Sequence, residues 1–221
     1  MIWWVSRFDG ISTMTQPNKD VFNVPNKLSA ARLLLSIAVF ALIPWHFYWA
    51  ALIVFVIAAG TDWVDGWWAR KYDQVTQLGR ILDPFCDKIL ICGSYILLAA
   101  EMTAVESFPW YAIIAGWMAV VIVGRELLVT VIRSMVEGSG GDFSAKMAGK
   151  VKMWFQCIAV GAALVALALN QQSPEAELPM WLLGILVIFV WASVSSTLYS
   201  GWLYVVMARG TILHGSKPDD E

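Results

Sequence analysis

The sequence predicts an all-α, polytopic membrane protein with six transmembrane helices, and three observations support this fold class. Hydrophobic residues make up 59% of the 221 residues, charged residues only 14%, and the mean hydropathy is +0.65. The apolar residues gather in six stretches, each close to the ~20 residues with which a helix crosses a bilayer. The connections between them are short, without a soluble domain, a linker or a low-complexity segment. Such a composition excludes a soluble globular domain.

The predicted elements follow one another along the chain. Residues 1–22 mix aromatic and polar residues and fit an N-terminal helix at the membrane interface, although Met14 would serve equally well as a start. The first span is apolar apart from four polar residues and closes at Pro44. The six spans are expected at residues 26–43, 47–70, 84–100, 110–133, 150–170 and 179–207. We therefore expect one membrane domain at residues 23–208 and a C-terminal tail at 209–221.

The distribution of basic residues predicts the orientation. All 15 lysines and arginines lie before or early in the first span, around the second and fourth connections, or after the sixth span. The other three connections carry glutamates instead: Glu101, Glu106, Glu175 and Glu177. By the positive-inside rule, both termini and the second connection face the cytoplasm, so we expect an integral protein of the cytoplasmic membrane.

Four aspartates stand at helical spacing on two consecutive segments, together with three small residues. At about 100° per residue, one stripe holds Asp62, Asp65, Gly66 and Ala69, and the next holds Gly79, Asp83 and Asp87. Unpaired carboxylates cost several kcal/mol in apolar surroundings, so a cation must hold them. Facing acidic oxygens suit Mg²⁺ or Mn²⁺ better than zinc. Ion pairs with nearby basic residues are the alternative, but they would not require small residues beside the acids.

The spacing D-x2-D-G-x2-A-R-x8-G-x3-D-x3-D resembles the signature of the CDP-alcohol phosphotransferases at every fixed position. The resemblance implies that two Mg²⁺ or Mn²⁺ ions are bound by Asp62, Asp65 and Asp83. It implies that Asp87 is the general base for the attacking hydroxyl, and we count it among the metal ligands too. The residues expected to bind the CDP group are Ser29, Arg32, Asp62, Asp65, Gly66, Ala69, Arg70 and Gly79.

Flanking stretches extend the resemblance, to the bacterial phosphatidylglycerophosphate synthases, from about residue 23 to residue 156. Upstream, N-x-P-x3-S-x2-R contains Ser29 and Arg32; the alternative is that Ser29 caps a helix while Arg32 reaches the membrane interface. Downstream, R-E-x6-R and G-K-x-K gather cations that would bind the phosphate of an acceptor alcohol, namely Arg125, Arg133, Lys146, Lys150 and Lys152. Positive-inside placement alone could explain Lys146 and Lys152. Met153 departs from the usual threonine, and Glu126 is interpreted as an internal ion-pair partner.

The resemblance implies an enzyme that transfers the phosphatidyl group of CDP-diacylglycerol to sn-glycerol 3-phosphate with release of CMP. The expected partners are these two substrates, membrane lipid and a second copy of the chain, and no nucleic acid. Another acceptor, such as inositol phosphate, serine or phosphatidylglycerol, remains the alternative within the family. A cation transporter with intramembrane carboxylates is the rival from another class, although it would place them near the midplane between repeated halves. A purely structural membrane protein is a third possibility.

Overall fold

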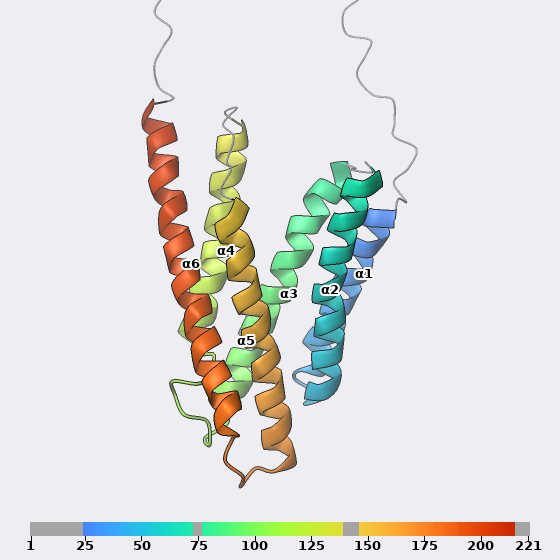
Figure 1. The fold of residues 1–221 in the computed structure, drawn as a ribbon, viewed down its shortest axis with the longest axis vertical. Helices are drawn as coiled ribbons and strands as arrows, with labels where there is room; N and C mark the ends of the chain where they lie inside the picture. Colours follow the sequence, from blue (N-terminus) through green and yellow to red (C-terminus); the bar gives the residue numbers. More distant parts are fainter. Residues whose placement is uncertain (1–23, 73–76, 139–145, 215–221) are drawn as a thin grey trace, which may run out of the picture.

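The computed structural model describes the backbone of residues 24–72, 77–138 and 146–214. Inside these ranges, side chains are described except at 24–28, 62–72, 77–84, 87, 133–138, 146–150 and 207–214. The described part consists of α-helices and contains no strand, so the predicted all-α class is confirmed (Figure 1). The helices are α1 (Val24–Leu42), α2 (Tyr48–Tyr72), α3 (Gln77–Ala104), α4 (Gly116–Gly138), α5 (Lys146–Gln172) and α6 (Met180–His214).

Successive helices run in opposite directions along the long axis of the molecule. The starts of α1, α3 and α5 therefore lie at the same end as the last turns of α2, α4 and α6 (Figure 1). We call this the aspartate end, because the backbone of residues 62–87 reaches it from α2 and α3. Residues far apart in the sequence are thereby gathered at one end of the bundle.

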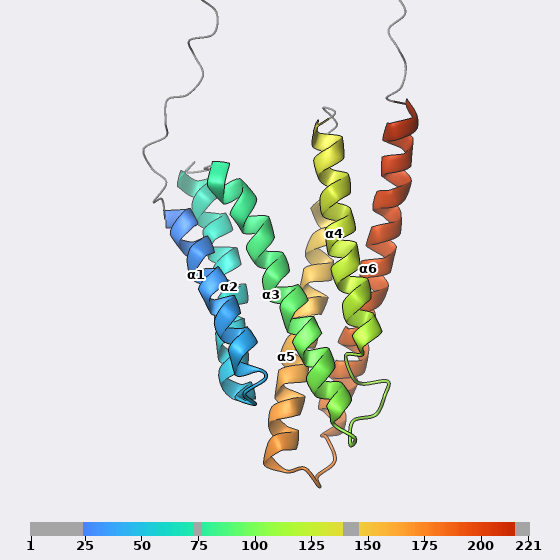
Figure 2. The ribbon, with the colours of Figure 1, turned by 180° about the vertical axis from the view of Figure 1, so that it is seen from behind.

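The six described helices form two groups, which meet along α3 and α5. In one group, α1 packs against α2 and α3; in the other, α6 packs against α4 and α5. Contacts of α3 with α4 and of α5 with α2 and α3 join the groups. The ribbons of the two groups spread apart toward the aspartate end, as the front and back views both show (Figure 2). Two groups of helices thus face each other at the end where the candidate site is expected.

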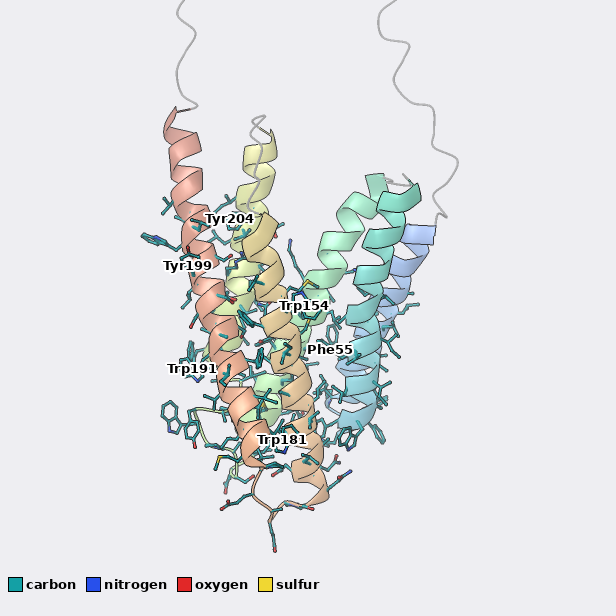
Figure 3. The ribbon with its side chains drawn as sticks, viewed as in Figure 1. Phe55, Trp154, Trp181, Trp191, Tyr199 and Tyr204 are labelled. Carbon is teal, nitrogen blue, oxygen red and sulfur yellow. The ribbon has the colours of Figure 1, made fainter. Side chains whose placement is uncertain are left out.

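The burial pattern combines a packed apolar interior with an apolar exterior. Buried core residues come from every described helix and include Val39, Phe55, Leu98 and Leu164. Large apolar side chains also cover the outside; the labelled Trp181 and Tyr199 of α6 are 62% and 68% exposed (Figure 3). An outer surface this apolar is unfavourable in water and favourable in lipid.

Two of the described helices are long and apolar enough to cross a membrane, at Val151–Gln172 and Met180–Val206. Shorter apolar stretches occupy Ser29–Leu42 and Tyr48–Thr61. The membrane nature of the chain is therefore supported, while the count of six spans stays a prediction. Charged residues within α3 and α4, among them Lys88, Arg125 and Glu126, interrupt the apolar runs of those helices.

Several helix boundaries differ from the sequence prediction. The fourth helix begins at Gly116 instead of Trp110, because residues 105–115 form turns closed by bonds such as Ala112 N–H to Pro109 O, 2.9 Å. This segment is apolar and partly buried, with Ile114 at 0% exposure, so its hydropathy resembles that of a helix. The third helix begins at Gln77, before Pro84, and α6 continues to His214, into the predicted tail.

The opposite end of the bundle is held by a small polar network. His46 has φ of 61°, in the left-handed region, and stands in the turn between α1 and α2. The Tyr48 hydroxyl donates to Glu101 Oε2 at 2.8 Å and lies 2.7 Å from His46 Nδ1. This network ties the first turn to the far part of α3, away from the aspartate end, and has no evident part in catalysis.

Candidate active site

The four aspartates lie on the two helices that meet at the aspartate end. Asp62 and Asp65 are in the last turns of α2, and Asp83 and Asp87 are in the first turns of α3. The two helices pack against each other, and spacings of three and four residues place each pair on one helical face. The side chains of these four residues, and of Gly66, Ala69, Arg70 and Gly79, lie outside the described part. Their roles in binding metal and CDP stay predictions.

Ser29 and Arg32 are buried on α1, with 0% and 1% exposure. Because Arg32 is buried, its side chain does not extend to the membrane interface. Ser29 is the sixth residue of α1, so it does not cap the start of this helix. Cys86 Sγ donates to the Ser29 carbonyl oxygen at 3.4 Å, which seats this part of α1 beside the turn of α3 that carries Asp87. This position beside the turn that carries Asp87 is consistent with the predicted role of Ser29 and Arg32 in binding CDP, which stays a prediction.

On α4 and α5, the buried Glu126 and Lys152 and the partly buried Arg125 form what we call the cationic cluster. Glu126 Oε1 accepts from Arg125 Nη1 at 3.2 Å and also from Lys152 Nζ. The side chains of Arg125, Glu126 and Lys152 are 9%, 12% and 6% exposed. Glu126 is thus an internal ion-pair partner, as the sequence predicted. Among the described side chains, two basic groups thus meet at one carboxylate.

A second set of contacts holds Arg125 from α6. Its Nη2 donates to Ser200 Oγ, and its Cζ lies 5.5 Å from the centre of the Tyr204 ring. A Cβ built on Gly201 would come within 3.2 Å of Arg125 Cγ. Sequence reasoning missed these three α6 residues, because they follow Arg125 by about 75 positions and no local motif marks them.

The remaining predicted acceptor residues share the aspartate end. Arg133 lies in the last turns of α4, and Lys146 and Lys150 lie in the first turns of α5. Their side chains are outside the described part, so contact with the cationic cluster is not established for them. The backbone nevertheless gathers these positions on the two helices that supply Arg125 and Lys152.

A polar bridge joins the two helical groups between these sites. Lys88 of α3, which follows Asp87 directly, donates from Nζ to Thr130 Oγ1 of α4. Thr130 Oγ1 in turn donates to the Glu126 carbonyl oxygen at 2.6 Å. The turn that carries the predicted general base is thereby linked to the helix that carries the cationic cluster. Neither Lys88 nor Thr130 was among the residues that the sequence predicted for the site.

Comparison with known proteins decides which family this arrangement belongs to. Residues 22–208 match the CDP-alcohol phosphatidyltransferase family. This chain belongs to the CDP-alcohol phosphatidyltransferase family. The match covers both helical groups and every residue predicted for the site, and the resemblance noted in the sequence is confirmed.

Relatives within the family carry one shared name, CDP-diacylglycerol–glycerol-3-phosphate 3-phosphatidyltransferase. The Bacillus subtilis protein is 36% identical over 202 residues, which cover 83% of this chain and 94% of the relative. The Pseudomonas fluorescens protein is 33% identical over 166 residues, covering 73% and 78%. The Salmonella typhimurium protein is 29% identical over 197 residues, covering 87% and 98%. This CDP-alcohol phosphatidyltransferase is thus similar along most of its length to enzymes of that name.

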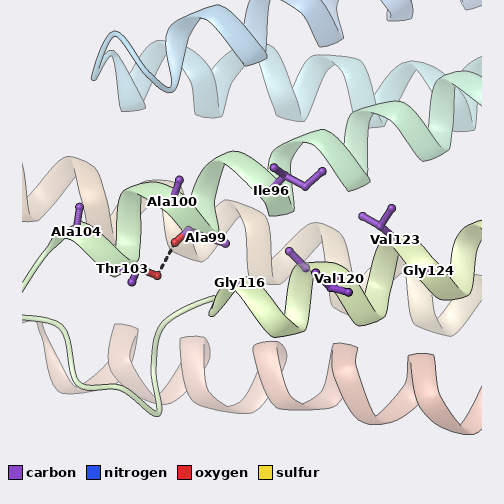
Figure 4. Close-up of a pocket in the computed structure, with 10 residues that line it drawn as sticks. Ile96, Ala99, Ala100, Thr103, Ala104, Gly116, Val120, Val123 and Gly124 are labelled. Atoms are coloured by element: carbon purple, nitrogen blue, oxygen red, sulfur yellow. Dashed lines mark hydrogen bonds between the residues drawn. The ribbon is translucent and has the colours of Figure 1, made fainter.

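A cavity of about 850 Å³ lies between α3 and α4 of this phosphatidyltransferase, away from the aspartate end (Figure 4). Its lining is apolar and includes Ile96, Val120 and Val123, with no titratable side chain. The one hydroxyl in the lining, on Thr103, donates to the Ala99 carbonyl oxygen at 2.6 Å. Because diphosphate chemistry requires charged groups, this cavity does not provide the reaction site.

Proposed function

We propose that this protein transfers the phosphatidyl group of CDP-diacylglycerol to sn-glycerol 3-phosphate, releases CMP and forms phosphatidylglycerophosphate for phospholipid biosynthesis. The shared name of relatives that match most of the chain supports the reaction. The structural observation that supports the acceptor assignment is the cationic cluster, where two basic side chains, Arg125 and Lys152, meet at Glu126 among the described residues. Guanidinium and ammonium groups both donate charge-assisted hydrogen bonds to phosphate, so the cluster suits the phosphate of glycerol 3-phosphate.

Different residues of the chain have different roles in the proposed reaction. Asp87 takes the proton from the 1-hydroxyl of glycerol 3-phosphate, and that oxygen attacks the phosphorus that bears the diacylglycerol. The bond from this phosphorus to the oxygen bridging to CMP breaks, and CMP leaves with that oxygen. Arg32 and Ser29 hold the CDP group from α1, while Arg125 and Lys152 hold the acceptor from the facing group of helices.

The donor set fits two divalent cations. Asp62, Asp65 and Asp83 supply carboxylate oxygens, with Asp87 adjoining them, and hard cations such as Mg²⁺ and Mn²⁺ prefer these ligands. Among the described side chains, no group of three or more histidines, cysteines or carboxylates could hold a metal elsewhere. Bound ions would neutralise charge on the diphosphate and the departing CMP.

We further propose that all six helices span the cytoplasmic membrane, with both termini and the aspartate end toward the cytoplasm. Lysines and arginines concentrate at that end, as the positive-inside rule requires. The tails of CDP-diacylglycerol then stay in the bilayer while its headgroup reaches α2 and α3. A second copy of the chain remains the expected protein partner, to be tested by the mass of the purified protein in detergent.

The test is CMP release by the purified protein from CDP-diacylglycerol across a panel of acceptors. We expect rapid release with sn-glycerol 3-phosphate and little with serine, inositol phosphate or phosphatidylglycerol. Release that occurs only with one of these others would assign a different acceptor within the family. No release with any acceptor, in the presence of Mg²⁺ or Mn²⁺, would contradict the proposed reaction.

A further inference from the structure

The inner face of α6 carries a stripe of buried polar side chains. Ser193, Thr197, Ser200 and Tyr204 follow one another at intervals of four, three and four residues, which is one face of a helix. All four are buried, with exposures from 0% to 2%. In an apolar helix, buried polar groups on one face need partners on neighbouring helices.

The members of the stripe contact three neighbouring helices, α3, α5 and α4. Tyr95 of α3 donates to Ser193 Oγ at 2.9 Å, and Gln156 Nε2 of α5 donates to Thr197 Oγ1 at 3.5 Å. At the end of the stripe nearest the aspartate end, Ser200 and Tyr204 both contact Arg125 of α4. The final part of the stripe is therefore directed at a residue of the cationic cluster.

The partners that α6 offers to Arg125 are neutral. A hydroxyl and an aromatic ring can fix the direction of a guanidinium without cancelling its charge. Glu126, by contrast, is anionic and is shared with Lys152. Contacts from α6 thus orient Arg125 without neutralising its charge.

The absence of a side chain at Gly201 sets how closely Arg125 approaches α6. A Cβ at this position would lie 3.2 Å from Arg125 Cγ, tighter than ordinary van der Waals contact, so the arginine stem would have to shift. A planar guanidinium recognises phosphate through two parallel hydrogen bonds, and a small displacement of its stem misdirects both.

We propose that Ser200 and Gly201 are positioning residues that hold Arg125 in the direction required to bind the phosphate of the acceptor. The inference rests on the proposed function and deepens it, because it assigns α6 a part in recognising the phosphorylated acceptor. It extends the acceptor site beyond the residues of α4 and α5 that the sequence marks.

The experiment compares Gly201→Ala and Ser200→Ala with Gly184→Ala, a matched control on the same helix where an added Cβ would meet no atom within 4 Å. KM and kcat are measured for each substrate in turn, with thermal stability in detergent alongside. We expect both test variants to raise KM for glycerol 3-phosphate roughly tenfold, the order expected when a charge-assisted contact is lost. KM for CDP-diacylglycerol should stay near the wild-type value, and the control should resemble the wild type in every measurement.

A double-mutant cycle separates positioning from general packing. If Gly201 acts through Arg125, adding Gly201→Ala to Arg125→Ala should cause little further rise in KM. Equal losses in both backgrounds, or an equal rise in KM for both substrates, would overturn the inference. Should Gly201→Ala fail to fold, Ser200→Ala decides, since it removes only one oxygen atom. Wild-type protein that does not use glycerol 3-phosphate would overturn the proposed function instead, whereas normal use with unaffected variants would overturn the inference alone.

Discussion

Glu126 of α4 and Lys152 of α5 form an ion pair in which both side chains are buried, 12% and 6% exposed. Arg125 completes the group, so a single carboxylate separates two cations. An arrangement of this kind is costly to desolvate, and its stability depends on every member being present.

The change Glu126→Gln should destabilise the protein by about 3–5 kcal/mol, because it leaves two buried cations beside each other without a counter-charge. The measurement is thermal or denaturant unfolding in detergent. Glu106→Gln is the matched control, since Glu106 is an exposed carboxylate in the turns before α4. Equal stability of the two variants would mean that Glu126 does not hold the cluster together.

Removal of divalent metal should abolish turnover, because the four aspartates at the aspartate end are the predicted ligands of two divalent cations. CMP release is measured in excess EDTA and after addition of Mg²⁺ or Mn²⁺. We expect either ion to restore activity. Full activity in EDTA, with carried-over metal excluded by elemental analysis, would contradict the two-ion site.

Asp83→Asn and Asp87→Asn should both abolish or nearly abolish activity but should differ in metal binding. Asp83 is a predicted metal ligand, whereas Asp87 is the predicted general base, and loss of a general base costs about 10²–10⁴-fold in rate. Titration of each variant with Mn²⁺ distinguishes them, and we expect weakened binding mainly in Asp83→Asn. Ordinary turnover of Asp87→Asn, with the pH dependence of the wild type, would remove Asp87 from that role.

The change Arg133→Ala should weaken the binding of glycerol 3-phosphate far more than the binding of CDP-diacylglycerol. Loss of a buried charge-assisted contact costs about 2–5 kcal/mol of binding, which appears mainly as a raised KM for the substrate that made it. Lys217→Ala, in the C-terminal segment, is a control for the loss of one positive charge. A KM effect confined to CDP-diacylglycerol would reassign Arg133 to the nucleotide or the lipid headgroup.

Much of the fold followed from the sequence because hydropathy and charge act over short windows. The number of described helices, their alternating direction and the common end of residues 62–87 and 125–152 agree with the prediction. The positions of the helix ends were predicted less accurately, because an apolar turn segment such as residues 105–115 has the hydropathy of a helix. A hydrogen bond from Trp191 Nε1 of α6 to the Tyr111 carbonyl oxygen, 3.0 Å, contacts this segment. A bond across 80 residues leaves no trace in a local pattern.

Some residues of the candidate site could be predicted from the sequence, and others could be found only from tertiary contacts. Arg125, Glu126 and Lys152 were found because charged residues are rare in apolar helices and so attract attention. Ser200, Gly201 and Tyr204 are ordinary residues of an apolar helix until the tertiary contacts with Arg125 are known. Whether Arg32 would be buried or reach the membrane surface was likewise undecided, because both outcomes fit the same residue at the same place on a helix.

The polar stripe of α6 has a consequence for biosynthesis. Ribosomes make the chain from its N-terminus, so α6 is the last of the described helices to be made and must pack against Tyr95, Gln156 and Arg125 on helices made earlier. Until α6 is in place, Arg125 lacks the hydroxyl and the ring that contact it, and the proposed acceptor site is incomplete. A nascent chain that already carries all four aspartates would therefore be unready to use lipid substrate, and the enzyme would become competent only once its final helix is in place.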